Sequence, residues 1–164
     1  MIRDDNRGIS LVELLAVISI LAILASGGIS VYKQLGYADT KRAANTVNSE
    51  MDEVRLETMS RARKPYLYLY KIDGTYFMKR SNETIPAAAE LNTASGTELS
   101  NKITLSYRYA ASPEVTLEPG MVLKISFDRS SGMFDQELEL IQIHSANHTT
   151  EITCVPETGR HWVE

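Results

Sequence analysis

The feature that most constrains this chain is a run of nineteen residues without a formal charge, from Leu14 to Tyr32. Leu, Ile, Val and Ala make up most of it, and as a helix it would be about 28 Å long, close to the thickness of a bilayer's hydrocarbon core. The run therefore predicts one membrane-crossing helix. A cleaved secretory signal is the alternative, because Arg3 and Arg7 precede the run and small residues occur near Ala25.

A single acid, Glu13, stands where this apolar helix begins. Translocon-type scales put an acidic residue at a helix centre at about 2.5 to 3.5 kcal/mol, and less towards an end. No Lys, Arg or His lies within the run to pair with it. We interpret Glu13 as functional, with a partner from another molecule. The acid also argues against a secretory signal, whose apolar region is normally uncharged.

The residues around Glu13 resemble a known processing signal. A short charged leader, MIRDDNR, is followed by Gly8-Ile9-Ser10-Leu11-Val12-Glu13-Leu14-Leu15 and then by the apolar run. This order resembles the class III signal of type IV prepilins and type II secretion pseudopilins. The resemblance implies cleavage between Gly8 and Ile9 by a prepilin peptidase, N-methylation of Ile9, and Glu13 as the fifth residue of the mature chain. Ile9 stands where the family most often has Phe.

The same resemblance implies a partner for Glu13. Cleavage creates an ammonium on Ile9, and staggered helices in a filament bring it beside the Glu13 carboxylate of a neighbouring subunit. Two unit charges 4 Å apart attract by about 4 kcal/mol at an effective dielectric of 20, before desolvation is subtracted. The implied partners are other pilin or pseudopilin subunits, the prepilin peptidase, an inner-membrane assembly platform, and membrane lipid before assembly.

Two glycines, Gly27 and Gly28, mark the weakest point of the helix, because each costs about 0.8 to 1 kcal/mol relative to Ala. Close helix packing in the membrane and a local melt on assembly, as in pilins, both remain open. The helix is predicted to continue over residues 33–64. There apolar positions recur at spacings of three and four, and Pro65 ends the helix after three basic residues in the last turn. These positions are Val47, Met51, Val54, Thr58 and Ala62.

The rest of the chain is predicted to be mainly β. Asp73-Gly74 predicts a hairpin turn between strands at residues 66–72 and 75–80, and the tyrosines of this hairpin are expected to pack in the core. Residues 81–101 are predicted to form a surface loop with a helical turn at 87–91. Further strands are expected at 103–110, 121–129, 137–145, 150–155 and 160–164.

The predicted fold is α+β and pilin-like, with a long N-terminal helix packed on a C-terminal antiparallel β domain. Its parts are a leader over residues 1–8, a transmembrane and filament-core helix over 9–32, an amphipathic continuation over 33–64, and a β-rich domain over 65–164. The succession of Gly and Thr-Gly-Arg turns between the last strands resembles H-type minor pseudopilins.

The sequence gives little indication of disulfides, metal sites, catalysis or nucleic-acid binding. The single cysteine excludes an intrachain disulfide and is expected to be buried, and the histidine spacings match no zinc pattern. Acids around the turn at 129–132 could hold calcium, although solvated acids are commoner at such turns. We expect no catalytic residues, no metal and no cofactor, hence no enzyme, and the net charge of -4 does not indicate nucleic-acid binding. The residues considered were His144, His148, His161 and Cys154 for zinc, and Asp128, Asp135 and Glu137 for calcium.

The function predicted from the sequence is a structural subunit, of the minor kind, of a type IV pilus or a type II secretion pseudopilus. It would first be a single-pass inner-membrane protein with its C-terminal domain extracytoplasmic, and then part of the filament. One alternative is a membrane-anchored extracytoplasmic binding domain that does not polymerise, and another is a secreted enzyme behind an ordinary signal peptide.

Overall fold

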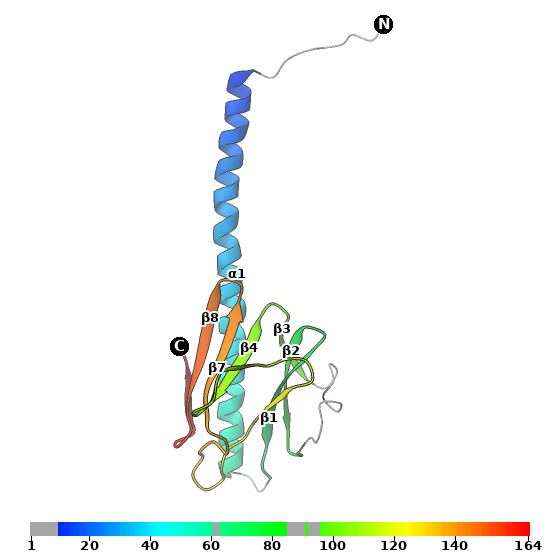
Figure 1. Ribbon diagram of the computed structural model, residues 1–164, viewed down its shortest axis with the longest axis vertical. Helices are drawn as coiled ribbons and strands as arrows, with labels where there is room; N and C mark the ends of the chain where they lie inside the picture. The colour runs from blue at the N-terminus through cyan, green and yellow to red at the C-terminus, as the bar shows by residue number, and fades with distance from the viewer. Residues whose placement is uncertain (1–9, 61–62, 85–90, 92–95) are drawn as a thin grey trace. The chain divides into compact units, whose positions relative to one another are not determined.

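The computed structural model describes residues 10–60, 63–84, 91 and 96–164, and within the helix it describes no side chains for residues 25–35. The chain divides into two compact units, residues 1–35 and 36–164. Each unit is described by itself. The first unit contributes the N-terminal part of α1, a helix that spans Leu11–Ser60, and the second contains the rest of α1 and every described strand (Figure 1).

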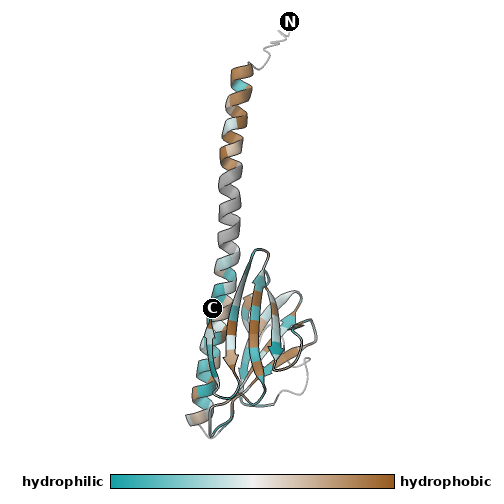
Figure 2. Cartoon of the chain, turned by 60° about the vertical axis from the view of Figure 1, so that its left-hand side comes forward, coloured by the Kyte–Doolittle hydropathy of each residue, from teal (hydrophilic) through white to brown (hydrophobic). Residues whose placement is uncertain are grey.

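The described side chains of the first unit are mostly apolar, as the brown residues near the N-terminal end of α1 show in Figure 2. Within the described residues, no helix is both long enough and apolar enough to cross a membrane.

The second unit contains two antiparallel sheets in addition to the C-terminal part of α1. The four-stranded sheet has the order β3 (Thr97–Ser100), β2 (Thr75–Ser81), β1 (Tyr66–Ile72) and β6 (Val122–Ile125). The five-stranded sheet has the order β5 (Val115–Thr116), β4 (Thr104–Tyr109), β7 (Leu138–Ser145), β8 (His148–Val155) and β9 (Arg160–Val163). The prediction of an α+β fold with antiparallel strands is confirmed.

The hairpin of β1 and β2 forms as its turn predicts. Asp73 and Gly74 have φ angles of 47° and 80°, and Ile72 faces Thr75 across the turn. Both central residues therefore have the positive φ that a two-residue hairpin turn of this kind requires. Tyr68, Tyr70 and Tyr76 are buried, so the expectation that tyrosines of this hairpin serve in packing is confirmed for these three.

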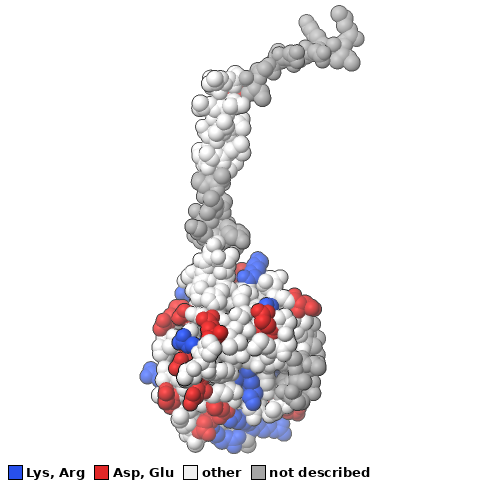
Figure 3. All heavy atoms as spheres, viewed as in Figure 1, with Lys and Arg blue, Asp and Glu red and all other residues white. Residues whose placement is uncertain are grey.

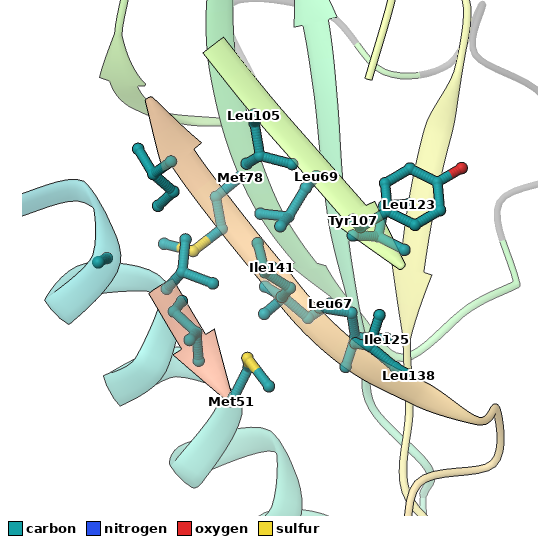
Figure 4. Packing of buried hydrophobic residues seen from close by; sticks show 14 of the residues in the cluster. Met51, Leu67, Leu69, Met78, Leu105, Tyr107, Leu123, Ile125, Leu138 and Ile141 are labelled. Atoms are coloured by element: carbon teal, nitrogen blue, oxygen red, sulfur yellow. The ribbon is translucent and has the colours of Figure 1, made fainter. Parts of the chain in front are cut away.

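One face of α1 covers the core of the second unit. The buried residues of this face, none of them more than 2% exposed, are Thr40, Ala43, Ala44, Val47, Met51, Val54 and Thr58. Figure 4 shows Met51 close to the strands, with Leu67 and Leu69 from β1 and Leu105 and Ile141 from the other sheet. The spacing of three and four in the sequence thus marks the face that the sheets bury, because it keeps these side chains on one side of a helix.

Three details of the prediction were wrong. The helix ends at Ser60 and not at residue 64, and no basic residue lies in its last turn. A residue before proline is disfavoured in the α region, which keeps Lys64 out of the helix ahead of Pro65. The predicted loop over 81–101 contains strand β3, and the turn before β6 contains the short strand β5. The helical turn predicted at 87–91 falls on residues that, apart from Leu91, lie outside the described part of the chain, as does Ala62.

Candidate functional site

The first turn of α1 is capped by Ser10. Its hydroxyl accepts a hydrogen bond from the backbone N–H of Glu13 at 3.2 Å, and its carbonyl accepts one from the N–H of Leu14 at 3.1 Å. This is the geometry of a helix N-cap, in which a serine oxygen satisfies one of the four N–H groups left free at the helix start. Sequence reasoning gave Ser10 no role, although a Ser followed by Glu three residues later is a recognisable start signal.

Glu13 therefore stands in the first turn of α1, where the helix dipole favours an acid by about 0.3 to 1 kcal/mol. The carboxylate is exposed, and no ion pair joins it to another described residue. The dipole term is smaller than the cost of an acid deep in hydrocarbon. The dipole interaction therefore explains why an acid stands at the helix start. It does not replace the charged partner that an acid needs inside an apolar environment.

The described side chains around and after Glu13 form an apolar surface on all sides of α1. Ten large apolar residues between Leu11 and Leu24 are at least 51% exposed. They are Leu11, Val12, Leu14, Leu15, Val17, Ile18, Ile20, Leu21, Ile23 and Leu24. Complete burial of each would be worth about 1.5 to 3 kcal/mol. A helix that is apolar all round belongs in a membrane or inside an assembly, so this surface needs a cover.

The charge distribution separates this segment from the rest. In Figure 3 the Lys, Arg, Asp and Glu side chains gather on the globular unit, whereas the described residues of the first unit are almost entirely white.

The candidate processing residues, Gly8 and Ile9, lie outside the described residues. Gly27 and Gly28 fall in the stretch 25–35, which also lies outside the described side chains, so both interpretations of the weak point stay predictions.

The three histidines weighed as metal ligands have separate surroundings. Nδ1 of His144 is 2.9 Å from the Thr149 hydroxyl, and the ring of His148 meets that of Tyr37 edge-on. The side chain of His161 is 1% exposed and packs near Phe127 and Phe134. The structure does not bring these side chains together as a ligand set.

Cys154 is buried, which confirms the expectation for that residue, and burial raises the pKa of its thiol to about 12.

Two of the three acids weighed for calcium, Asp128 and Asp135, are engaged in local hydrogen bonds and an ion pair. Asp128 Oδ1 accepts bonds from the hydroxyl and backbone N–H groups of Ser130 and Ser131 at 2.6 to 3.0 Å. These donors, the side-chain hydroxyls first, hold the pKa of Asp128 well below its usual range. Asp135 pairs with Lys64 at 2.6 Å. Among the described residues, no group of three or more acids, histidines or cysteines is arranged to hold a metal ion.

The comparison with known families addresses the N-terminal segment and nothing beyond it. Residues 3–29 match the prokaryotic N-terminal methylation motif. The methylation motif takes in Ser10, Glu13 and all ten exposed apolar residues, and it supports a prepilin signal of the type IV pilin kind. No curated protein and no solved structure matches the chain. The resemblance to H-type pseudopilins therefore stays a prediction, and the candidate functional site is the methylation motif itself.

Proposed function

We propose that this chain is a structural subunit, of the minor kind, of a type IV pilus or a type II secretion pseudopilus. In this proposal it is inserted in the inner membrane through its first helix, cleaved after Gly8 and assembled through the N-terminal helices. The match of residues 3–29 to the methylation motif carries the proposal.

The exposed segment gives the proposal its physical basis. Ten large apolar side chains need burial, and lipid before assembly followed by neighbouring helices afterwards would supply it. In lipid alone the Glu13 carboxylate has no partner within the described residues, and an unpaired charge is costly to bury there. In the assembly the new ammonium of Ile9 on a neighbouring subunit would pair with the Glu13 carboxylate. This ion pair would fix the axial register between one helix and the next.

The mature N-terminus tests the proposal directly. Mass spectrometry of the protein from membranes is expected to show a chain that starts at Ile9, with or without one methyl group. A start near Ser26 would refute the proposal in favour of a secreted protein, and an intact Met1 would favour an anchored domain that does not polymerise.

Variants of the first helical turn test the role of the acid. Glu13→Gln keeps the shape of the side chain and removes its charge, so we expect normal cleavage after Gly8 and a loss of incorporation into filaments. The matched control is Ser10→Ala, which removes the cap hydroxyl and leaves the acid in place. If Ser10→Ala lowers incorporation as much as Glu13→Gln, helix capping and not charge pairing explains the need for this turn.

A further inference from the structure

Strand β9 is an open edge of the five-stranded sheet. It pairs with β8 on one side, and within the described part of the chain no strand pairs with its other side. In Figure 1 this strand leads to the C-terminus at one side of the sheet. An edge strand presents unpaired backbone N–H and C=O groups, which another strand can bind. The side of β9 away from β8 therefore offers hydrogen-bonding groups to a partner.

The register between β8 and β9 shows which backbone groups are free. Glu164 donates a backbone hydrogen bond to Glu151 at 2.9 Å and accepts one from it at 3.5 Å. Bonded and non-bonded pairs alternate in an antiparallel ladder, so Trp162 is again a bonded position, whereas His161 and Val163 are non-bonded positions. The N–H and C=O groups of His161 and Val163 thus point away from β8.

His161 also shows that this edge is open to solvent. Its side chain is only 1% exposed, yet the residue as a whole is half-buried. The exposed area of His161 is therefore main chain. Among the described residues, none forms a hydrogen bond to the outward backbone groups of His161 or Val163. Two outward positions separated by one residue have the spacing at which an added antiparallel strand forms its hydrogen bonds.

Two side chains beside this edge indicate what an added strand must carry. Arg160 and Trp162 lie on the outer face of β9, because side chains alternate along a strand and His161 occupies the inner face. Trp162 is 42% exposed, and no described carboxylate pairs with Arg160. Together with Val155 and Thr158 they line a hollow of about 410 Å³. The hollow thus combines an indole ring with an unpaired cation.

We propose that β9 binds an extended segment of a different protein, which adds to the sheet as a further strand. Every described strand pair is antiparallel, and we assign the same direction to the added strand. Two of its residues then exchange backbone hydrogen bonds with Val163 and His161, in that order along the segment. This mode of recognition takes its affinity from the backbone and its specificity from alternate side chains.

The side chains of the hollow define the segment further. The residue between the two bonded positions lies opposite Trp162, and the residue after them lies opposite Arg160. Directly opposed side chains stabilise a strand pair when both are apolar or when their charges are opposite. The partner segment therefore carries an apolar residue and, two positions later, an acid. This inference goes beyond the proposed function and does not depend on it.

Fluorescence of the chain's single tryptophan reports binding directly, because Trp162 lines the hollow. The probe is the peptide Thr-Thr-Ile-Thr-Glu-Thr with both ends blocked, titrated into the full chain in detergent. We expect saturable binding with a change in the Trp162 emission. A control peptide in which Ile and Glu are exchanged has the same composition. It should bind about tenfold more weakly, because both cross-strand pairs are lost.

Methylation of backbone nitrogens in the peptide tests the strand geometry. N-methyl groups on the two threonines that flank Ile remove the N–H groups that would bond to Val163 and His161, and we expect no measurable binding. N-methyl groups on Ile and Glu lie on the far side of the added strand, so this peptide should bind about as well as the unmodified one. Equal binding of the two methylated peptides would overturn the inference.

A proline on the open edge gives the matching test on the chain itself. Val163→Pro removes an N–H that takes no part in the pairing with β8, so the sheet is expected to remain intact. We expect peptide binding to weaken by at least about tenfold, because one hydrogen bond is lost and the ring obstructs the edge. Val163→Ala is the matched control, since it also shortens the side chain but keeps the N–H, and it should bind nearly as well as the parent.

A charge exchange tests Arg160. Arg160→Glu is expected to weaken binding of the peptide by about tenfold, because it places two acids opposite each other. The same peptide with Lys in place of Glu should then bind the variant better than it binds the parent. Lys102→Glu makes the same change of net charge on the turn before β4 and should leave binding unchanged.

Three further outcomes would overturn the inference. The first is an unchanged Trp162 emission at the solubility limit of the unmodified peptide. The second is dimerisation of the parent chain that Val163→Pro prevents, which would make a second copy the occupant of the edge. The third is a thymidine oligonucleotide that displaces the peptide and binds Val163→Pro as well as the parent, since stacking on Trp162 needs no strand edge. None of these measurements depends on the start of the mature chain, so the proposed function can stand or fail separately.

Discussion

Arg55 connects α1 to two turns at the end of the globular unit. Its Nε donates a hydrogen bond to the carbonyl oxygen of Gly132 at 2.9 Å, and its Nη2 donates one to that of Thr158 at 3.0 Å. Gly132 lies between β6 and β7, and Thr158 lies between β8 and β9. One side chain on the helix thus fixes two connections that are distant in the sequence.

The cost of removing this guanidinium follows from the two bonds. A hydrogen bond to a charged group contributes about 1.5 to 3 kcal/mol when it is shielded from water. The bond to Thr158 is exposed and the bond to Gly132 is only partly buried, so a reduced total of about 2 to 4 kcal/mol is appropriate. For a unit of this size, that loss lowers the melting temperature by about 10 °C.

Arg55→Met is the variant that tests this estimate, because it keeps much of the aliphatic stem and removes every donor. Thermal unfolding of the full chain in detergent, followed by near-ultraviolet circular dichroism, reports the second unit. Arg42→Met is the matched control, since Arg42 lies exposed on the same helix, and it should change the melting temperature by no more than about 2 °C. Equal shifts for both variants would refute the anchoring role of Arg55.

Three further results are expected. Gly159→Ala should destabilise the fold by at least about 3 kcal/mol in denaturant unfolding, because its Cβ would lie 1.8 Å from the carbonyl oxygen of Gly132. The control is Gly74→Ala, whose Cβ meets no atom within 4 Å, so it should cost only about 1 kcal/mol of backbone strain. Asp128, whose pKa is lowered, should stabilise the fold fully above its unfolded value of about 3.9, with that contribution lost as the pH falls further. The stability difference from Asp128→Asn should therefore be constant above about pH 5 and shrink in acid. Native Cys154, with a pKa of about 12, should react with a thiol reagent at pH 8 at least about a thousandfold more slowly than in the unfolded chain, and equal rates would contradict its burial.

Much of the fold could be predicted because local patterns and tertiary packing agree. The spacing of Val47, Met51 and Val54 marked the face that the sheets bury, and Asp73-Gly74 marked the hairpin. Strands β3 and β5 could not be predicted in this way. Both are short edge strands, and β3 carries no large apolar pattern, so its pairing depends on the neighbouring strand β2. The backbone hydrogen bonds of β3 form only when β2 is already in place beside it.

The functional residues also include some that the sequence predicted and others that only the structure showed. Glu13 was visible because an acid beside a long apolar run is costly once the helix is in an apolar environment, and the matched motif over residues 3–29 supports the signal around it. The partners of the charges further along α1 were not visible, because the helix sequence contains several charges of both signs. The structure shows which of them meet a group from the strands, since Arg80 from β2 pairs with Glu53 and Nε2 of His161 from β9 lies 3.2 Å from Asp52.

The sequence by itself determined the apolar N-terminal segment, the acid within it, the continuous helix face that is buried and the main β hairpin. These features depend on hydropathy, helical period and backbone preference, which act over a few neighbouring residues. Only the tertiary structure decided where the helix ends, how the strands are divided between two sheets, and which charges on α1 meet a group from the strands. Those outcomes depend on contacts between residues far apart in the chain, as between Arg55 and Thr158 or between Glu53 and Arg80.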